Sequence, residues 1–65
     1  MQPGALDVGE QFARLASMLE DAHGLAVEGQ VHDLASDEYR VLVGQLHRVI
    51  GQMRECNNAV ERALR

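Results

Sequence analysis

The chain has almost none of the residues that cross-link or interrupt a small fold. Its 65 residues include one cysteine, Cys56, so no disulfide can form within a single chain. Proline occurs once, at Pro3, and nothing after it forbids helix. Lysine, threonine and tryptophan are absent. Because a chain this short buries only about 60% of its unfolded surface, its stability is marginal and a stabilising partner is expected.

Long apolar runs are also missing. No stretch of the sequence approaches the roughly 18 apolar residues that a membrane-spanning helix requires. The first residues carry neither the basic patch nor the apolar run of a secretory signal peptide. With one cysteine and no such leader, we expect a cytoplasmic protein in a reducing environment, without a membrane partner.

Charge is divided unevenly along the chain, whose net charge is −4. Residues 1–38 hold eight carboxylates against one arginine, which gives −7. Residues 39–65 hold five arginines against two carboxylates, which gives +3. Such an asymmetry indicates pairing between the two halves or with a partner.

Residues 8–29 are predicted to form the first helix. Asp7 can accept the free N–H groups of the first turn and Glu10 can return the bond, as in a capping box. Met18 and Leu25 widen its hydrophobic stripe to the breadth typical of a bundle helix. The stripe itself has the 4-3-4 spacing of one helix face and consists of Val8, Phe12, Leu15, Leu19, Ala22 and Ala26.

A connection over residues 30–36 is expected next, because the stripe stops at Gly29 and this glycine can act as a C-terminal cap. Val31 and Leu34 are its expected anchors. A short third helix over residues 30–35 is an alternative that the sequence leaves open.

Residues 37–64 are predicted to form the second helix, capped by Ser36. Val43, Ile50 and Leu64 flank its hydrophobic stripe at positions related by sevens. The stripe consists of Tyr39, Leu42, Leu46, Val49, Met53, Cys56, Val60 and Ala63. Two long helices with a short connection pack antiparallel, so the expected fold is all-α, a single amphipathic helical hairpin over residues 1–65.

A lone hairpin leaves half of each stripe exposed to water. Each large apolar side chain there forgoes about 1.5–3 kcal/mol of burial. We therefore expect the hairpin to complete a four-helix bundle, as a homodimer or with another protein. The end of the second helix, from Cys56 to Leu64, is expected to have the least cover within one chain and to carry the partner. The residues expected at this interface are Tyr39, Leu42, Leu46, Val49, Ile50, Met53, Cys56, Val60, Leu64, Phe12, Leu15 and Leu19.

No combination of residues indicates catalysis or metal binding. Ser17 and Ser36 are the only serines, and neither lies in a pattern that indicates a cleft with a base. His23, His32 and His47 are nine and fifteen residues apart, unlike the close ligand pairs of zinc sites. We expect no enzymatic activity and no metal or cofactor.

Acidic residues suggest one alternative function, because a compact acidic face can imitate a nucleic-acid backbone. In size and charge the chain resembles the small inhibitors of phages and mobile elements, anti-CRISPR proteins among them. That resemblance implies an inhibitor of a nucleic-acid-binding complex. The residues of such a face are Glu10, Glu20, Asp21, Glu28, Asp33, Asp37 and Glu38.

Arginines on the second helix suggest another alternative, since a basic row can bind phosphates. The row consists of Arg40, Arg48, Arg54 and Arg62. In size and expected architecture the chain resembles Rop, a small hairpin dimer that binds RNA loop pairs, although no residues can be matched. The acidic balance and the lack of stacking aromatics make nucleic acid the less favoured partner. The first hypothesis is therefore a non-enzymatic helical protein that regulates or inhibits a partner protein.

Overall fold

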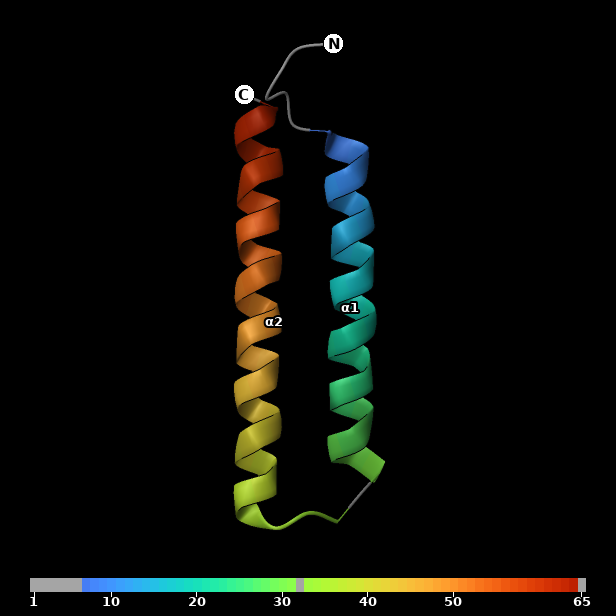
Figure 1. The fold of residues 1–65 in the computed structure, drawn as a ribbon, viewed down its shortest axis with the longest axis vertical. Coiled ribbons are helices and arrows are strands. Elements are labelled where there is room, and N and C mark those ends of the chain that lie inside the picture. The colour runs from blue at the N-terminus through green and yellow to red at the C-terminus, as the bar shows by residue number, and fades with distance from the viewer. Residues whose placement is uncertain (1–6, 32, 65) are drawn as a thin grey trace.

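The computed structural model describes residues 7–31 and 33–64, which form two antiparallel helices (Figure 1). Helix α1 spans Val8–Val31 and helix α2 spans Ser36–Ala63. The start of α1 lies beside the end of α2, and the connection closes the opposite end of the pair (Figure 1). The predicted all-α helical hairpin is confirmed.

The start of α1 has the predicted cap. The backbone N–H of Glu10 donates to Asp7 Oδ1 at 3.1 Å, and the N–H of Gln11 donates to the Asp7 carbonyl at 3.1 Å. The Glu10 carboxylate also lies 3.6 Å from the Arg14 guanidinium, one turn along the helix. The Asp7 side chain therefore satisfies one of the N–H groups that a helix start leaves free.

The end of α1 differs from the prediction, because the helix continues through Gly29 to Val31. Gly29 faces α2 rather than capping α1: a β-carbon added there would lie 3.5 Å from Leu42 Cδ1. A glycine inside a helix costs about 1 kcal/mol relative to alanine. A β-carbon at this position would make an ordinary van der Waals contact with Leu42, so the packing against α2 does not require glycine here.

The connection contains no third helix in its described residues, since Gln30 and Val31 belong to α1 and residues 33–35 are not helical. Leu34 is half-buried, and its N–H donates to the Tyr39 hydroxyl at 3.4 Å. Leu34 is thus the anchor that was expected. Val31, the other expected anchor, is 67% exposed.

At the start of α2 the prediction that Ser36 is the N-cap was wrong. Ser36 is the first helical residue, and the capping position is held by Ala35 in an extended conformation. The N–H of Ala35 donates to Glu38 Oε1 at 3.1 Å, and the N–H of Tyr39 donates to the Ala35 carbonyl at 3.0 Å. The carboxylate of Glu38 secures this helix start, because its longer side chain can turn back to the residue before the helix.

The two helices share a core that is one layer deep. Its most buried side chains are Leu42, Cys56 and Val60, which are 7%, 7% and 5% exposed. These three belong to the predicted α2 stripe, as do the half-buried Leu46, Val49 and Met53. The half-buried residues of α1 are Val8, Gln11, Leu15, Met18, Ala22, Leu25 and Gly29.

Helix α1 is therefore rotated relative to the expectation. Gln11, Met18 and Leu25 lie inside, whereas Phe12 and Leu19 are each 57% exposed. The row that contains Gln11 and the row that contains Phe12 flank the same inner residues, such as Leu15. The helical spacing of the sequence therefore does not predict which of the two rows lies inside. Cys56 helps to hold Gln11 inward, because its thiol lies 3.3 Å from the Gln11 carbonyl oxygen and 3.1 Å from its Oε1.

The expectation that the end of α2 has the least cover was wrong for Cys56 and Val60. Both are among the three most buried residues of the described chain, because the first turns of α1 pack over them. Leu64, at 70% exposed, and the exposed Ala63 fit the expectation. The uncovered apolar surface lies along one side of the hairpin instead of at its end.

Candidate functional site

The two sides of the hairpin differ in chemistry, and their residues can be identified from the core. Phe12 follows the inner residue Gln11 by one position, and Val43 follows Leu42 in the same way. In a pair of antiparallel right-handed helices, this offset places both rows on the same side of the pair. We call that side the apolar face. Its residues are Phe12, Leu19, Ala26, Val43, Ile50 and Leu64.

Five of these six residues are large hydrophobic side chains that leave about half or more of their surface in water. Phe12 and Leu19 are 57% exposed, Val43 is 64%, Ile50 is 47% and Leu64 is 70%. Asn57 and Ser36, which are polar and uncharged, occupy the remaining positions of the row on α2. No position of the apolar face on either helix carries a charge. A continuous uncharged hydrophobic strip of this kind is typical of a protein-binding surface.

Two contacts fix which residues of the face lie level with one another. Gly29 packs against Leu42, and Gln11 contacts Cys56. Between these contacts, the antiparallel register places Leu19 level with Ile50. One heptad to either side, Ala26 lies level with Val43 and Phe12 lies level with Asn57. The centre of the face is therefore hydrophobic on both helices.

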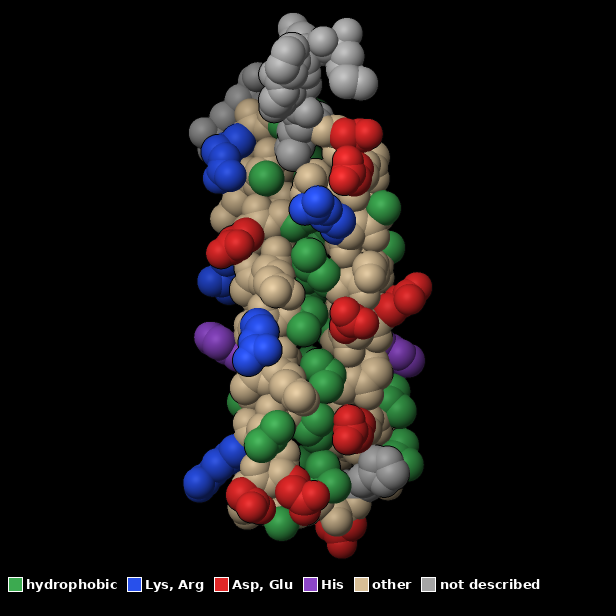
Figure 2. Space-filling model, viewed as in Figure 1, with side chains coloured by type: hydrophobic (Ala, Val, Ile, Leu, Met, Phe, Trp, Pro, Cys, Tyr) green, Lys and Arg blue, Asp and Glu red, His purple; other side chains and the backbone are tan. Residues whose placement is uncertain are grey.

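The opposite side, which we call the polar face, is made by the residues that precede the other inner row. These residues are Asp7, Arg14, Asp21, Glu28, Glu38, Gln45, Gln52 and Ala59. Figure 2 shows acidic side chains along α1 on the right and hydrophobic side chains at the bottom of the groove between the helices. Five of the eight positions carry a charge, whereas the apolar face carries none.

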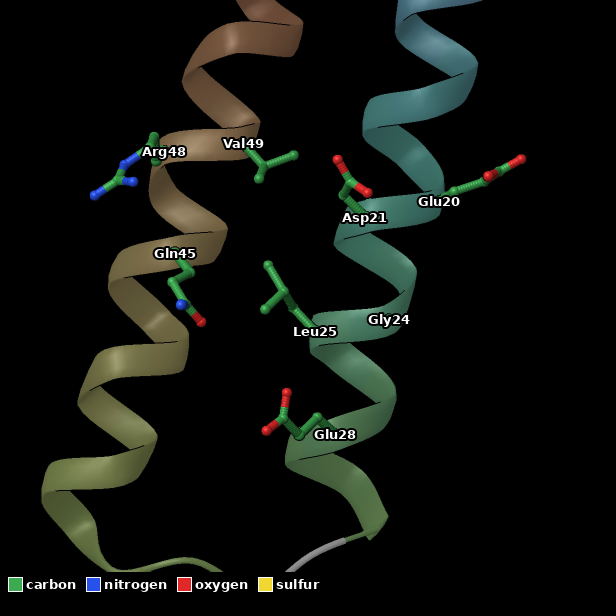
Figure 3. Close-up of a pocket in the computed structure, with 8 residues that line it drawn as sticks. All are labelled: Glu20, Asp21, Gly24, Leu25, Glu28, Gln45, Arg48 and Val49. Carbon is green, nitrogen blue, oxygen red and sulfur yellow. The ribbon is translucent and has the colours of Figure 1, made fainter.

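A shallow groove runs along the middle of the polar face. Asp21, Leu25 and Glu28 point into it from α1 (Figure 3). Gln45 and Val49 point into it from α2, and Gly24 leaves its wall open (Figure 3). The groove therefore has an aliphatic floor with carboxylates on one wall.

The predicted acidic residues do not form one compact face. All seven are exposed, but Asp33, Asp37 and Glu38 lie at the connection end of the hairpin. Glu20 points away from the groove into which Asp21 and Glu28 point (Figure 3). The carboxylates are thus distributed over two sides of α1 and one end of the pair.

The predicted arginines lie on α2 in two neighbouring rows. Arg40 and Arg54 are two heptads apart in one row, and Arg48 and Arg62 are two heptads apart in the next. All four are exposed, and Arg48 points away from the groove (Figure 3). This surface lies on the side of α2 that is turned from α1.

The predicted interface residues divide between the interior and the surface. Seven of them lie in the core of a single hairpin: Leu15, Leu42, Leu46, Val49, Met53, Cys56 and Val60. Phe12, Leu19, Ile50 and Leu64 lie on the apolar face. Tyr39, 38% exposed, lies beside the connection. Val43 and Ala26, which were not among the predicted interface residues, complete the face. The spacing of Val43, Ile50 and Leu64 by multiples of seven residues was the sequence pattern that indicated its α2 row.

Groups that could do chemistry are isolated from one another in the described chain. Within residues 7–31 and 33–64, no three metal-ligating side chains come together, and His32 lies outside the described residues. Ser17 and Ser36 are exposed on different helices. The buried thiol of Cys56 is held by Gln11.

Comparisons with known proteins do not identify a relative of this chain. No protein family, curated protein or solved structure was found to match it. In the part of the chain that the structure describes, neither helix is long and apolar enough to cross a membrane. The fold and the apolar face are the features that can support a function.

Proposed function

We propose that this chain is a non-enzymatic helical interaction protein that regulates or inhibits a partner protein by packing its apolar face against another protein. The observation that supports the proposal is the exposure of Phe12, Leu19, Val43 and Ile50 along one side of the hairpin. Helices that lay such a face into a hydrophobic groove, or into a bundle, are a recurring mode of recognition.

The energetics favour association. Full burial of each large apolar side chain is worth about 1.5–3 kcal/mol, and each of these retains roughly half of its surface in water. A 65-residue chain with a core one layer deep has little stability to spare. Covering the apolar face therefore stabilises both the fold and the complex.

Regulation by packing requires no reacting group. The described residues form a straight rod whose Cα atoms extend 50 × 17 × 15 Å, so one face can cover a long stretch of a partner. A reducing compartment, the cytoplasm in our proposal, suits the free thiol of Cys56.

The proposal can be tested by capturing a partner from the native cell and measuring that partner's activity. The purified chain should change the activity of the captured protein. Ile50→Asp should abolish the change, because it places a carboxylate at the centre of the apolar face. Gln45→Asp adds the same charge to the polar face of α2 and is the matched control. An effect that survives Ile50→Asp while both variants remain helical by circular dichroism would contradict the proposal.

The acidic groove favours a second candidate function, an acidic mimic that blocks a nucleic-acid-binding complex. Asp21 and Glu28 both point into one groove, and Glu20 lies nearby on α1 (Figure 3). Asp21→Lys with Glu28→Lys should then abolish inhibition, while Ile50→Asp should leave it unchanged. This pair of results is the reverse of those expected for the apolar face.

A further inference from the structure

We propose that the apolar face is covered by a second copy of this chain, placed so that the two connections lie at opposite ends of a four-helix bundle. The two copies are then related by a two-fold axis that crosses the helices at the level of Leu19 and Ile50. The inference rests on the proposed function, since it names what covers the same apolar face while the regulated partner is absent; the second copy and that partner then compete for the face.

The size of the face suits a dimer. The hairpin is 50 Å long and 17 Å wide between Cα atoms, so one side of it presents about 850 Å². A stable interface buries about 800 Å² on each partner. One side of the hairpin is therefore comparable in size to a standard dimer interface, and the apolar face takes up the middle of that side.

The chemistry of the face suits a second copy as well. In a two-fold dimer a residue at the axis meets its own equivalent, so a charge at the level of Leu19 or Ile50 would meet a like charge, and a charge elsewhere in the face would need an opposite charge at the position that it faces. The apolar face has no charged residue, whereas Arg14, Asp21, Glu28 and Glu38 all lie on the polar face. Four-helix packing through the apolar face leaves these charges in water.

The distribution of large and small residues sets the orientation. Phe12 and Ala26 lie two heptads apart on α1, at equal distances from Leu19. With the connections at opposite ends, Phe12 of each copy faces Ala26 of the other copy, and Leu19 faces Leu19. Each of the two outer layers then combines Phe12 and Asn57 of one copy with Ala26 and Val43 of the other, and the middle layer holds Leu19 and Ile50 of both copies, so the layers have similar volumes, as close packing at a constant helix spacing requires.

The opposite orientation packs less evenly. With both connections at one end, two copies of Phe12 would share one layer and two copies of Ala26 another. The bundle would be overfilled near the start of α1 and hollow near its end, and each defect destabilises a core.

Leu64 agrees with the same orientation. It lies one heptad beyond Asn57, past the start of α1, and is 70% exposed. Leu34, in the connection, lies a similar distance beyond Ala26. When Phe12 and Asn57 lie over Ala26 and Val43 of the second copy, Leu64 reaches the connection of that copy.

Spin-label distances measure the orientation directly. Asp33→Cys, in a Cys56→Ala background, places one nitroxide in the connection of each copy. Asp33 is fourteen residues from Leu19, so at 1.5 Å per residue the two labels should be about 40 Å apart. Connections at the same end would place the labels within about 20 Å, because packed helices lie 8–10 Å apart.

Disulfide formation tests the same orientation of the two copies without a spin label. Leu19→Cys in the same background should form a covalent dimer on oxidation, because it faces its own equivalent across the axis. Phe12→Cys, equally exposed and on the same row, should remain unlinked because it faces Ala26.

The outcomes separate the two proposals. A mass of two 7.2-kDa chains by sedimentation, with a long label distance, supports the arrangement. A dimer with a short distance overturns the orientation. A monomer at micromolar concentration overturns the second copy as occupant. Neither of the last two results contradicts the proposed function, whose test is the activity of a different protein.

Discussion

The apolar face and the polar face are built on the same two helices, yet they differ in almost every property that governs association. Phe12, Leu19 and Ile50 are exposed to water on one side of the hairpin, and the rows to which they belong contain no charged residue. Asp21 and Glu28 lie on the other side, beside a groove that water can fill. A backbone that is nearly symmetric thus has one side suited to packing and one suited to solvent.

The difference shows that the hydrophobic stripe of each helix has two parts, which lie in different surroundings in the fold. One part of each stripe closes the hairpin, through residues such as Leu42 and Val60. The adjoining part, one position further along the chain, stays exposed to water. A stripe three-sevenths of a helix wide is broader than a two-helix fold can cover, and the excess lies on a single side.

The largest expected effect is the loss of association in Ile50→Asp. A carboxylate at the centre of the apolar face would have to be buried without a partner, so we expect self-association to weaken at least ~100-fold, or ~3 kcal/mol. Gln45→Asp, with the same charge on the same helix, should change it less than about twofold. Sedimentation over a range of concentrations measures both variants. Equal weakening in the two would show that the faces do not differ in function.

A smaller effect separates the core from the apolar face at two neighbouring residues. Leu42 is 7% exposed and Val43 is 64% exposed. We expect Leu42→Ala to destabilise the dilute, monomeric hairpin by about 2 kcal/mol, at the low end for core truncations because a thin core can relax. Val43→Ala should cost that monomer less than about 0.5 kcal/mol. Thermal unfolding at low concentration provides the measurement, and a comparable loss in both variants would refute the division.

A gain in stability is expected from Gly51→Ala and, in the same way, from Gly44→Ala. A β-carbon at either position meets nothing within 4 Å, because both lie on the outer edge of α2, away from the two faces. Each alanine should stabilise the helix by about 0.8–1 kcal/mol. Denaturant titration measures the gain. If either alanine weakens partner binding instead, the outer edge is a third contact surface where a backbone approaches closely.

The smallest effect is expected from neutralising the groove. Asp21→Asn with Glu28→Gln keeps the shape of both side chains and removes two charges from the polar face. Self-association should change less than about twofold, since exposed charges contribute little and are screened by salt. Sedimentation at two salt concentrations checks this. A large change would mean that the polar face takes part in the dimer.

Much of the fold could be predicted from local sequence signals. The Asp7 cap, the α2 stripe and the hairpin all follow from spacing and from short-range hydrogen bonding. The connection was harder to predict. Serine is a common residue at the N-cap, so Ser36 was expected there. In the structure the Glu38 carboxylate instead accepts a hydrogen bond from the Ala35 N–H. Local sequence favours neither of these two helix starts over the other.

The apolar face could be predicted only in part. Phe12, Leu19, Ile50 and Leu64 were expected at an interface, together with residues such as Cys56 and Val60 that one hairpin already buries. A sequence of heptads specifies which residues are hydrophobic, whereas the division between intrachain and interchain burial depends on how α1 is rotated. That rotation is not a local property.

The sequence by itself determined two amphipathic helices, their antiparallel pairing and a hydrophobic surface too large for one chain. The tertiary structure decided which row of α1 turns inward. Gln11, Met18 and Leu25 flank Leu15 and Ala22 on one side as Phe12, Leu19 and Ala26 flank them on the other, so periodicity is equal for both rows. Close packing against α2, with Gln11 held by Cys56, places the first row inside and leaves the second row exposed to water.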